Sequence, residues 1–158
     1  MTDQTLDEMR ALLAPTIAAN AAFDGWSDLA RDTAADAAGI DRGVAALAFP
    51  GGAVDMIDAW FASVDARMAE ALPLETLARM KIRERITELV EARLAAVAAD
   101  RESLRRALAI LAMPQHLARA AKLAWRTVDL IWRQAGDTAA DYNHYTKRTI
   151  LLLSLIHI

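Results

Sequence analysis

The stretch Ala38-Gly-Ile-Asp-Arg-Gly-Val-Ala-Ala-Leu-Ala-Phe-Pro-Gly-Gly52 decides the fold. Gly39 suits the C′ position just beyond the end of a helix, and Asp41 suits the N-cap of the next helix. The helix that Asp41 begins can reach only Phe49, because Pro50-Gly51-Gly52 is a strong break. The stretch therefore predicts the end of one helix, a very short second helix and the start of a third.

The rest of the chain has apolar residues at the 3.6-residue period of a helix, and no segment alternates like a strand. Helices are expected over about residues 3–21, 27–39, 41–49, 53–72, 82–97, 101–112 and 114–135. Pro15 is expected to bend or interrupt the first of these helices. Gly136-Asp137-Thr138 is the next break, and an eighth helix is expected to follow it. The sequence thus predicts an all-α protein without internal repeats.

The composition limits the classes of function. The chain has 158 residues, of which 55% are hydrophobic and 25% charged, so a domain with a substantial core is expected. The absence of cysteine excludes disulfides, thiol catalysis and cysteine zinc sites. A net charge of −3 gives no bulk electrostatic reason for nucleic-acid binding. The acidic start lacks the features of a secretory signal and no stretch is apolar enough to span a bilayer, so a cytoplasmic location is expected.

No catalytic motif is evident. The sequence has no Gly-x-Ser-x-Gly, no P-loop and no dinucleotide fingerprint. Asp137, Asp141 and His144 could lie on one helix face, but a carboxylate–histidine metal site needs ligands from several elements. Asp137 is better explained as a helix cap, and Asp141 as the partner of a nearby cation. We therefore expect no catalytic residues, no metal and no cofactor.

The segment from Trp125 to Arg148 is the richest in aromatic residues. Trp125 and Trp132 are seven residues apart and lie on one helix face. They lie beside a charged stripe of Arg119, Lys122, Arg126, Asp129 and Arg133. Two interpretations stay open: the tryptophans fill a core, or they lie at its boundary and meet a partner protein or a lipid. Arg133 follows Asp129 by four residues, so the two side chains are expected to form an ion pair.

The region from Trp26 to Phe61 resembles the helix-turn-helix of TetR-family repressors. The matching residues are Ala38-Gly39-Ile40, Asp41-Arg42-Gly43 and Phe49-Pro50. The resemblance implies a TetR-like helical bundle. The repressors carry polar base-reading residues on the short helix and a phosphate-binding lysine after Phe-Pro. Here Ala46-Leu47-Ala48 and Gly51-Gly52-Ala53 stand in their place, and only Arg42 remains for polar contacts. We expect a degenerate helix-turn-helix and no nucleic-acid partner. A TetR-type DNA-binding repressor is the alternative function.

Three landmarks together resemble the ubiquinone-biosynthesis accessory proteins of the Coq-nine type. They are Phe23-Asp24-Gly25-Trp26, Phe49-Pro50-Gly51-Gly52 and the long motif from Trp125 to Arg148. The resemblance covers about residues 3–152. It implies a TetR-like fold that no longer binds DNA, shelters an isoprenoid lipid in an apolar pocket and assists the di-iron demethoxyubiquinone hydroxylase. His144 departs from the family pattern, because many relatives carry an aromatic residue there, and Arg133 stands where a tyrosine is expected.

The resemblance implies a non-catalytic accessory protein that presents a polyprenylated quinone precursor to the hydroxylase. The expected lipid is an isoprenoid quinone precursor or a phospholipid, and the residues expected to contact it are Val54, Ile57, Phe61, Ile86, Val90, Leu94, Ala124, Val128 and Ile131. The residues expected to bind the partner are Asp129, Trp132 and Arg133. Peripheral contact with the inner membrane and a homodimer are both compatible with the resemblance. Periodicity alone does not distinguish a solid core from a lipid cavity.

The chain is expected to form a single all-α domain, 1–158. Residues 1–50 would form the helix-turn-helix-like part and residues 51–152 the lipid-binding helical part. The last six residues, Leu153-Ser-Leu-Ile-His-Ile158, match the translation of a transposon adapter used in sequencing libraries. We therefore expect residues 153–158 to be a non-native tail; the alternative is a genuine apolar helix end.

Overall fold

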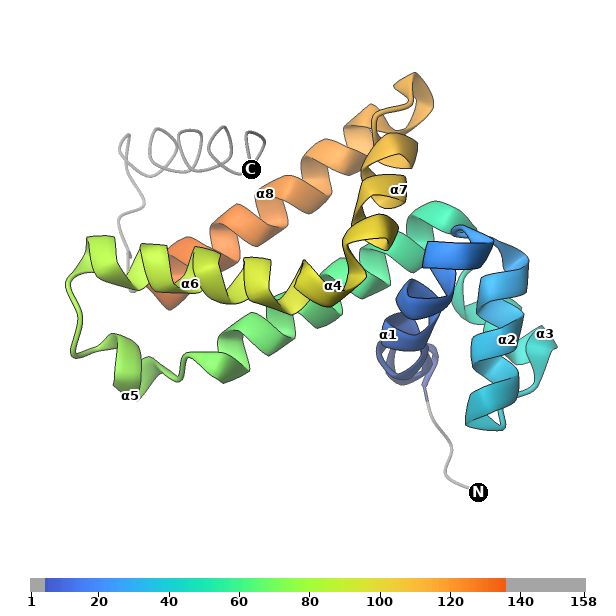
Figure 1. The fold of residues 1–158 in the computed structure, drawn as a ribbon, viewed down its shortest axis with the longest axis horizontal. Coiled ribbons are helices and arrows are strands. Elements are labelled where there is room, and N and C mark those ends of the chain that lie inside the picture. The colour runs from blue at the N-terminus through green and yellow to red at the C-terminus, as the bar shows by residue number, and fades with distance from the viewer. Residues whose placement is uncertain (1–4, 136–158) are drawn as a thin grey trace. The chain divides into compact units, whose positions relative to one another are not determined.

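The computed structural model describes residues 5–135, and these residues form helices joined by short turns (Figure 1). The elements are α1 (Leu6–Asp24), α2 (Asp28–Ala38), α3 (Arg42–Ala48), α4 (Ala53–Ala71), α5 (Leu74–Leu77), α6 (Ile82–Val97), η1 (Ala98–Asp100), α7 (Arg101–Leu111), η2 (Pro114–His116) and α8 (Leu117–Gln134). No strand occurs within this range, which confirms the all-α prediction. The short α2 and α3 before the long α4 follow the order expected of a TetR-like bundle. The eighth predicted helix, with Asp137, Asp141 and His144, and the tail 153–158 lie outside the described residues.

The caps that the sequence predicts set the boundaries of the short helices. The side chains of Ser27 and Asp41 accept the backbone N–H of the residue three positions on, at 3.3 and 3.2 Å. Gly39 ends α2 in the left-handed region with φ 70°, a conformation that costs glycine little. The helix ends and starts predicted between residues 38 and 52 are therefore confirmed.

Three details differ from the sequence prediction. Pro15 lies inside α1 without interrupting it; it lies on the exposed face, where water can reach the carbonyl that loses its N–H partner. The four-residue α5 was not expected; Pro73 precedes it with the fixed backbone that suits a helix start. Pro114 opens a 3-10 turn, and α8 itself begins at Leu117.

The packing divides the chain into two compact units. The first contains the described residues up to Val64 together with Val97–Leu117, and the second contains Asp65–Ala96 and the described residues from Ala118 onward. Helix α4 contributes to both units. In the first unit, α1 packs against α2, α3 and α7. The second unit contains α5 and nearly all of α6 and α8.

The core of the first unit is aromatic. Trp60 is fully buried, and its ring centroid lies 5.4 Å from that of Trp26 and 5.5 Å from that of Phe61. The indole N–H of Trp26 donates to the carbonyl of Ser103 at 3.0 Å, and the Ser103 hydroxyl donates to the carbonyl of Ala18. These bonds join α7 to α1 and to the turn that follows α1. The first unit is thus closed by aromatic packing, with hydrogen bonds from Trp26 and Ser103 joining its elements.

Candidate functional site

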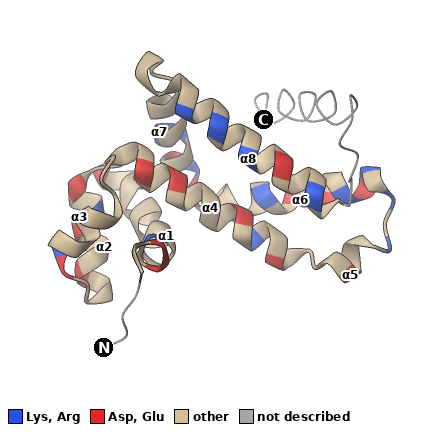
Figure 2. Cartoon of the chain, turned by 180° about the vertical axis from the view of Figure 1, so that it is seen from behind, with Lys and Arg blue, Asp and Glu red and all other residues tan. Residues whose placement is uncertain are grey.

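Helix α8 carries six of the twelve residues that the sequence assigns to function. Its buried face consists of Leu123, Thr127, Val128, Ile131 and Trp132. Cationic side chains lie elsewhere on the helix, and Figure 2 shows blue bands recurring along α8. Lys122, Arg126 and Arg133 are exposed. The helix therefore combines an apolar packing face with a basic outer face.

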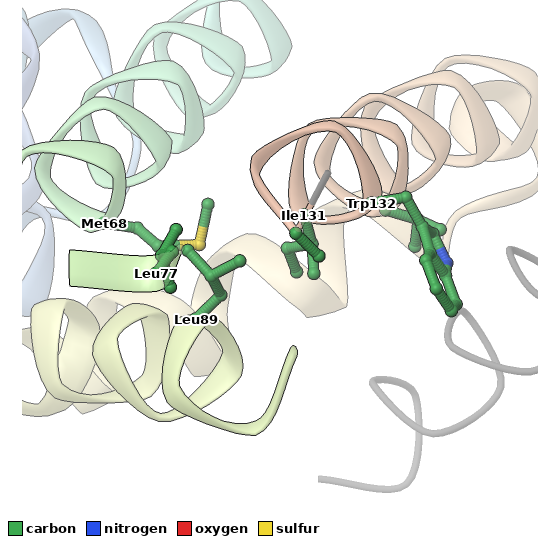
Figure 3. Close-up of a cluster of buried hydrophobic side chains, with 7 residues drawn as sticks. Met68, Leu77, Leu89, Ile131 and Trp132 are labelled. Atoms are coloured by element: carbon green, nitrogen blue, oxygen red, sulfur yellow. The ribbon is translucent and has the colours of Figure 1, made fainter. Parts of the chain in front are cut away.

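The inner face of α8 is part of a cluster of buried apolar side chains. Its members are Met68, Leu77, Leu89, Val128, Ile131, Trp132 and Ala135. Figure 3 shows Met68, Leu77 and Leu89 close together, with Trp132 drawn apart from them. Ile131 is fully buried, whereas Trp132 keeps 8% of its surface exposed. Trp132 thus lies at the edge of the cluster, and its role in binding a partner stays a prediction.

The nine residues expected to contact lipid fall into two groups by burial. Val54, Ile57, Phe61, Val128 and Ile131 are buried, whereas Ile86, Val90, Leu94 and Ala124 are half-buried. They are also divided between the units: the three α4 residues belong to the first unit and the other six to the second. Within the second unit, Ile86 and Val90 pack against the buried cluster. Contact of these residues with a lipid stays a prediction.

Helix α6 has an apolar side that is only partly covered. Of its residues only Leu89 and Val97 are buried, while Ile86, Val90 and Leu94 keep part of their surface accessible. These last three recur every four residues, so they form one stripe along two turns of the helix. We call Ile86, Val90 and Leu94 the α6 strip. It is partly accessible apolar surface beside a closed apolar cluster.

The predicted ion pair on α8 is confirmed. A guanidinium nitrogen of Arg133 lies 2.7 Å from a carboxylate oxygen of Asp129. The Arg133 side chain is 72% exposed and the Asp129 side chain 22%. The pair holds the carboxylate in a fixed position on the outer face of α8, although an exposed pair of this kind adds only about 0.3–0.5 kcal/mol to stability.

A buried polar network in the second unit was not predicted from the sequence. The guanidinium of Arg93 lies 3.1 Å from the carboxylate of Asp65, and the hydroxyl of Thr127 donates to the same carboxylate at 3.1 Å. The network joins α4, α6 and α8, and the Asp65 and Arg93 side chains are only 6% and 15% exposed. Asp65 follows directly after Val64, which lies on the apolar stripe of α4 and is fully buried. That neighbour was the one indication in the sequence that Asp65 lies near the core. Its partners are 28 and 62 residues away, so no helical spacing could identify them.

Arg85 was also missed, and it fixes the end of α8. Its guanidinium donates to the carbonyl of Ala135 at 2.8 Å and to the carbonyl of Met80 at 2.8 Å. The last carbonyls of a helix lack partners within the helix and carry partial negative charge. A cation at this place therefore sets where α8 ends, immediately before Gly136-Asp137-Thr138.

The helix-turn-helix face offers little for DNA. The exposed residues of α3 are Arg42, Gly43 and Leu47, and Leu47 is 66% exposed. Arg42 lies 2.6 Å from Asp36 on α2. Its hydrogen bond lowers the pKa of the Asp36 carboxyl, and the same bond raises the pKa of Arg42. The one cation on the short helix is thus engaged by a carboxylate, as expected of a degenerate helix-turn-helix.

Gly51 and Gly52 shape the start of α4. Gly52 has φ 70°, and the N–H of Gly51 donates to the carboxylate of Asp55 at 2.6 Å. A Cβ at Gly51 would lie 2.7 Å from a carboxylate oxygen of Asp55, so the Asp55 side chain would have to move to admit one. A carboxylate therefore lies beside the position where the repressors carry a phosphate-binding lysine.

The described residues form neither a metal cluster nor a single helix of membrane-spanning character. Among residues 5–135, no group of three or more His, Asp or Glu side chains is placed to hold a metal ion. In the same range no single helix has the length and apolar composition to cross a membrane, whereas α3 and α4, bent by 78°, meet that test only as a pair.

Comparison with known proteins adds the following findings. Residues 117–156 match the COQ9 family. The chain is 38% identical over 66 residues to the ubiquinone biosynthesis protein COQ9, mitochondrial, of Rattus norvegicus, and 36% identical over 66 residues to the protein of the same name in Homo sapiens. Each match covers 42% of this chain and 21% of the relative, so the chain spans about a fifth of the length of the curated relatives it matches.

Proposed function

We propose that the chain belongs to the COQ9 family and that it serves ubiquinone biosynthesis as a non-catalytic accessory protein that binds an isoprenoid lipid. The family match over α8 carries the proposal, because it covers the helix on which the buried cluster and the basic outer face meet. The proposed ligand is a polyprenylated quinone precursor, and a phospholipid is the second candidate for the same site.

The α6 strip supports the lipid part of the proposal. Each CH₂ of a polyprenyl tail that is moved from water to apolar surroundings contributes about 0.8 kcal/mol. Ile86, Val90 and Leu94 offer accessible apolar atoms along about two turns, next to a cluster that is already closed. An extended tail lying along this strip would cover it without opening the buried core. The fully buried Val128 and Ile131 would then support the strip from behind.

The basic face of α8 supports the partner part of the proposal. The proposed partner is the di-iron demethoxyubiquinone hydroxylase, which would meet Asp129, Trp132 and Arg133. Aromatic and arginine side chains are the residues that most often dominate the energy of protein interfaces. The Asp129–Arg133 pair fixes the polar part of this surface, and the accessible edge of Trp132 would supply its apolar part.

The alternative function, a TetR-type DNA-binding repressor, is not favoured. Sequence readout needs hydrogen-bonding side chains on the helix that enters the major groove. The exposed positions of α3 offer Leu47, a glycine and an arginine that already pairs with Asp36.

Organic extraction of the purified protein followed by mass spectrometry tests the proposed function. We expect a polyprenylated quinone precursor or a phospholipid in stoichiometric amount. The extract of a buffer-matched helical protein of similar size, purified in the same way, serves as the control for lipid carried along from the cells. Protein that yields no lipid above this control, and that no ubiquinone analogue stabilises against heat, would contradict the proposal.

A further inference from the structure

The outer face of α1 is apolar, although the outer face of a surface helix normally carries charged residues. Leu12 and Phe23 on this face are 49% and 87% exposed, and Pro15 and Ala19 between them are also exposed. The four residues follow one another in steps of three or four, so they form a single stripe along the helix. The opposite face of α1 is buried within the first unit. We call Leu12, Pro15, Ala19 and Phe23 the α1 stripe.

The surroundings of the α1 stripe are acidic. The described residues of the first unit, 5–64 and 97–117, contain eleven Asp or Glu residues and six arginines. Arg10 donates to a backbone carbonyl, and Arg31 and Arg42 form ion pairs with carboxylates of α2. Arg106 of α7, which lies beside Gly25 at the end of α1, pairs with Glu102, as does Arg105. Glu8 precedes the stripe by one turn and Asp24 follows it, and both are exposed. The surface thus combines exposed apolar side chains with carboxylates in excess of the available cations.

We propose that the α1 stripe docks a basic amphipathic helix of a protein partner. Apolar residues at positions i, i+3, i+4 and i+7 of such a helix would cover Leu12 and Phe23. Lysine and arginine residues beside them would meet Glu8, Asp24 and the other carboxylates of this part of the chain. The stripe belongs to the first unit and the proposed hydroxylase surface to the second, so this docking site goes beyond the proposed function.

Charge distinguishes a basic helix from two other possible occupants of the α1 stripe, a membrane surface and a second copy of this chain. Helices that lie in a membrane interface carry Lys or Arg beside their apolar face, and the α1 stripe has carboxylates at its ends instead. Anionic lipids would be repelled by the same groups. A second copy of this chain docked stripe to stripe would bring like charges together. A basic helix satisfies the apolar and the electrostatic requirement at once.

Two synthetic helical peptides test the proposal, and both carry leucine at positions i, i+3, i+4 and i+7. The remaining positions are lysine in one peptide and glutamate in the other. Binding to the full chain is measured by fluorescence anisotropy at physiological ionic strength. We expect the lysine peptide to bind and the glutamate peptide not to bind. Phe23→Gln and Leu12→Gln should each weaken binding about tenfold or more. Leu108→Gln is the matched control, because Leu108 of α7 is 52% exposed and lies outside the stripe.

Several results would overturn the proposal. Equal affinity of all three variants for the lysine peptide would show attraction by charge alone. Binding to phosphatidylcholine–phosphatidylglycerol vesicles that Phe23→Gln abolishes would make the occupant a membrane. A dimer in sedimentation that dissociates in Phe23→Gln would make it a second copy. Phe23→Gln should melt like the wild type, because Phe23 is 87% exposed. Leu12 and Leu108 are about half exposed, so their two variants should melt alike, and Phe23→Gln carries the test if both melt lower.

Discussion

The two units differ in how they close their cores. The first buries an aromatic group around Trp60, where the Trp26 indole N–H and the Ser103 hydroxyl donate to backbone carbonyls. The second buries an ion pair between Asp65 and Arg93 and leaves the α6 strip half-covered. The described part of the segment that matches the COQ9 family, residues 117–135, lies almost wholly in the second unit. The difference lies in the cores: the first unit closes on aromatic side chains, whereas the second places a buried ion pair beside a partly covered apolar strip.

The largest expected effect comes from breaking the buried network of the second unit. Asp65→Ala should lower the free energy of unfolding by about 3–5 kcal/mol, because it leaves the Arg93 cation buried without its carboxylate. The double variant Asp65→Leu/Arg93→Met should recover most of the loss, since apolar groups of similar size replace both charges. Urea denaturation of the three proteins measures these differences.

Ser103→Ala provides the comparison from the first unit. It removes a neutral hydrogen bond to the carbonyl of Ala18 and should cost about 1–3 kcal/mol. If Asp65→Ala were no more destabilising than Ser103→Ala, the ion pair would not anchor the second unit, and the contrast between the two cores would be wrong.

A smaller effect is expected on the proposed hydroxylase surface. Arg133→Glu places a second carboxylate beside Asp129 and should weaken binding to the hydroxylase about tenfold or more. Arg105→Glu is a close control: Arg105 is 73% exposed against 72% for Arg133, and it also pairs with a carboxylate, at 2.6 Å. Both variants should melt close to the wild type. Pull-down with the hydroxylase separates them, and equal retention of the two variants would place the partner surface elsewhere.

Trp132→Ala is a less direct test of the same surface. The side chain is 92% covered and belongs to the buried cluster, so its removal should lower stability as well as any affinity. The exposed Arg133 can be changed without disturbing that packing, which is why it carries the prediction.

The smallest expected effect concerns pH. Hydrogen bonds from Arg105 and Arg106 lower the pKa of Glu102 from its ordinary value of 4.5 to about 2. Because the folded-state pKa is lowered, the stabilisation is present above pH 4.5 and is lost as the pH falls toward about 2. Glu102→Gln should remove this small dependence, and a titration of the carboxyl by NMR should give the lowered pKa. A midpoint near 4.5 would show that the two arginines do not lower the pKa of Glu102.

Local patterns predicted the helices, whereas contacts between distant residues could not be predicted. Ser27, Gly39 and Asp41 act on residues within one turn of themselves, so their capping roles follow from the sequence. The Asp129–Arg133 pair lies at helical spacing and was predicted for the same reason. The partners of Asp65 depend on how α6 and α8 pack against α4, and the helical period does not encode that packing.

The candidate site shows the same limit. The period of α6 identifies Ile86, Val90 and Leu94 as one apolar stripe, but it does not tell whether neighbouring helices cover that stripe. The structure shows that they cover it only in part, while Val128 and Ile131 of the same predicted set are fully buried. Variants intended to block a lipid should therefore be placed on α6, because a larger residue at Val128 or Ile131 would overpack the core.

A titration with a short-chain ubiquinone analogue, followed by thermal shift, tests the lipid-binding claim most directly. Val90→Trp should fill the α6 strip, and Leu94→Trp serves as a second variant at the same surface. Glu88→Trp is the control, because Glu88 is exposed and lies two residues from Val90, on the opposite side of α6. We predict that the analogue stabilises the wild type and Glu88→Trp by about 2.7 kcal/mol at a hundredfold excess over Kd, and both strip variants far less. Equal stabilisation of all four proteins, or of none, would contradict lipid binding at this strip.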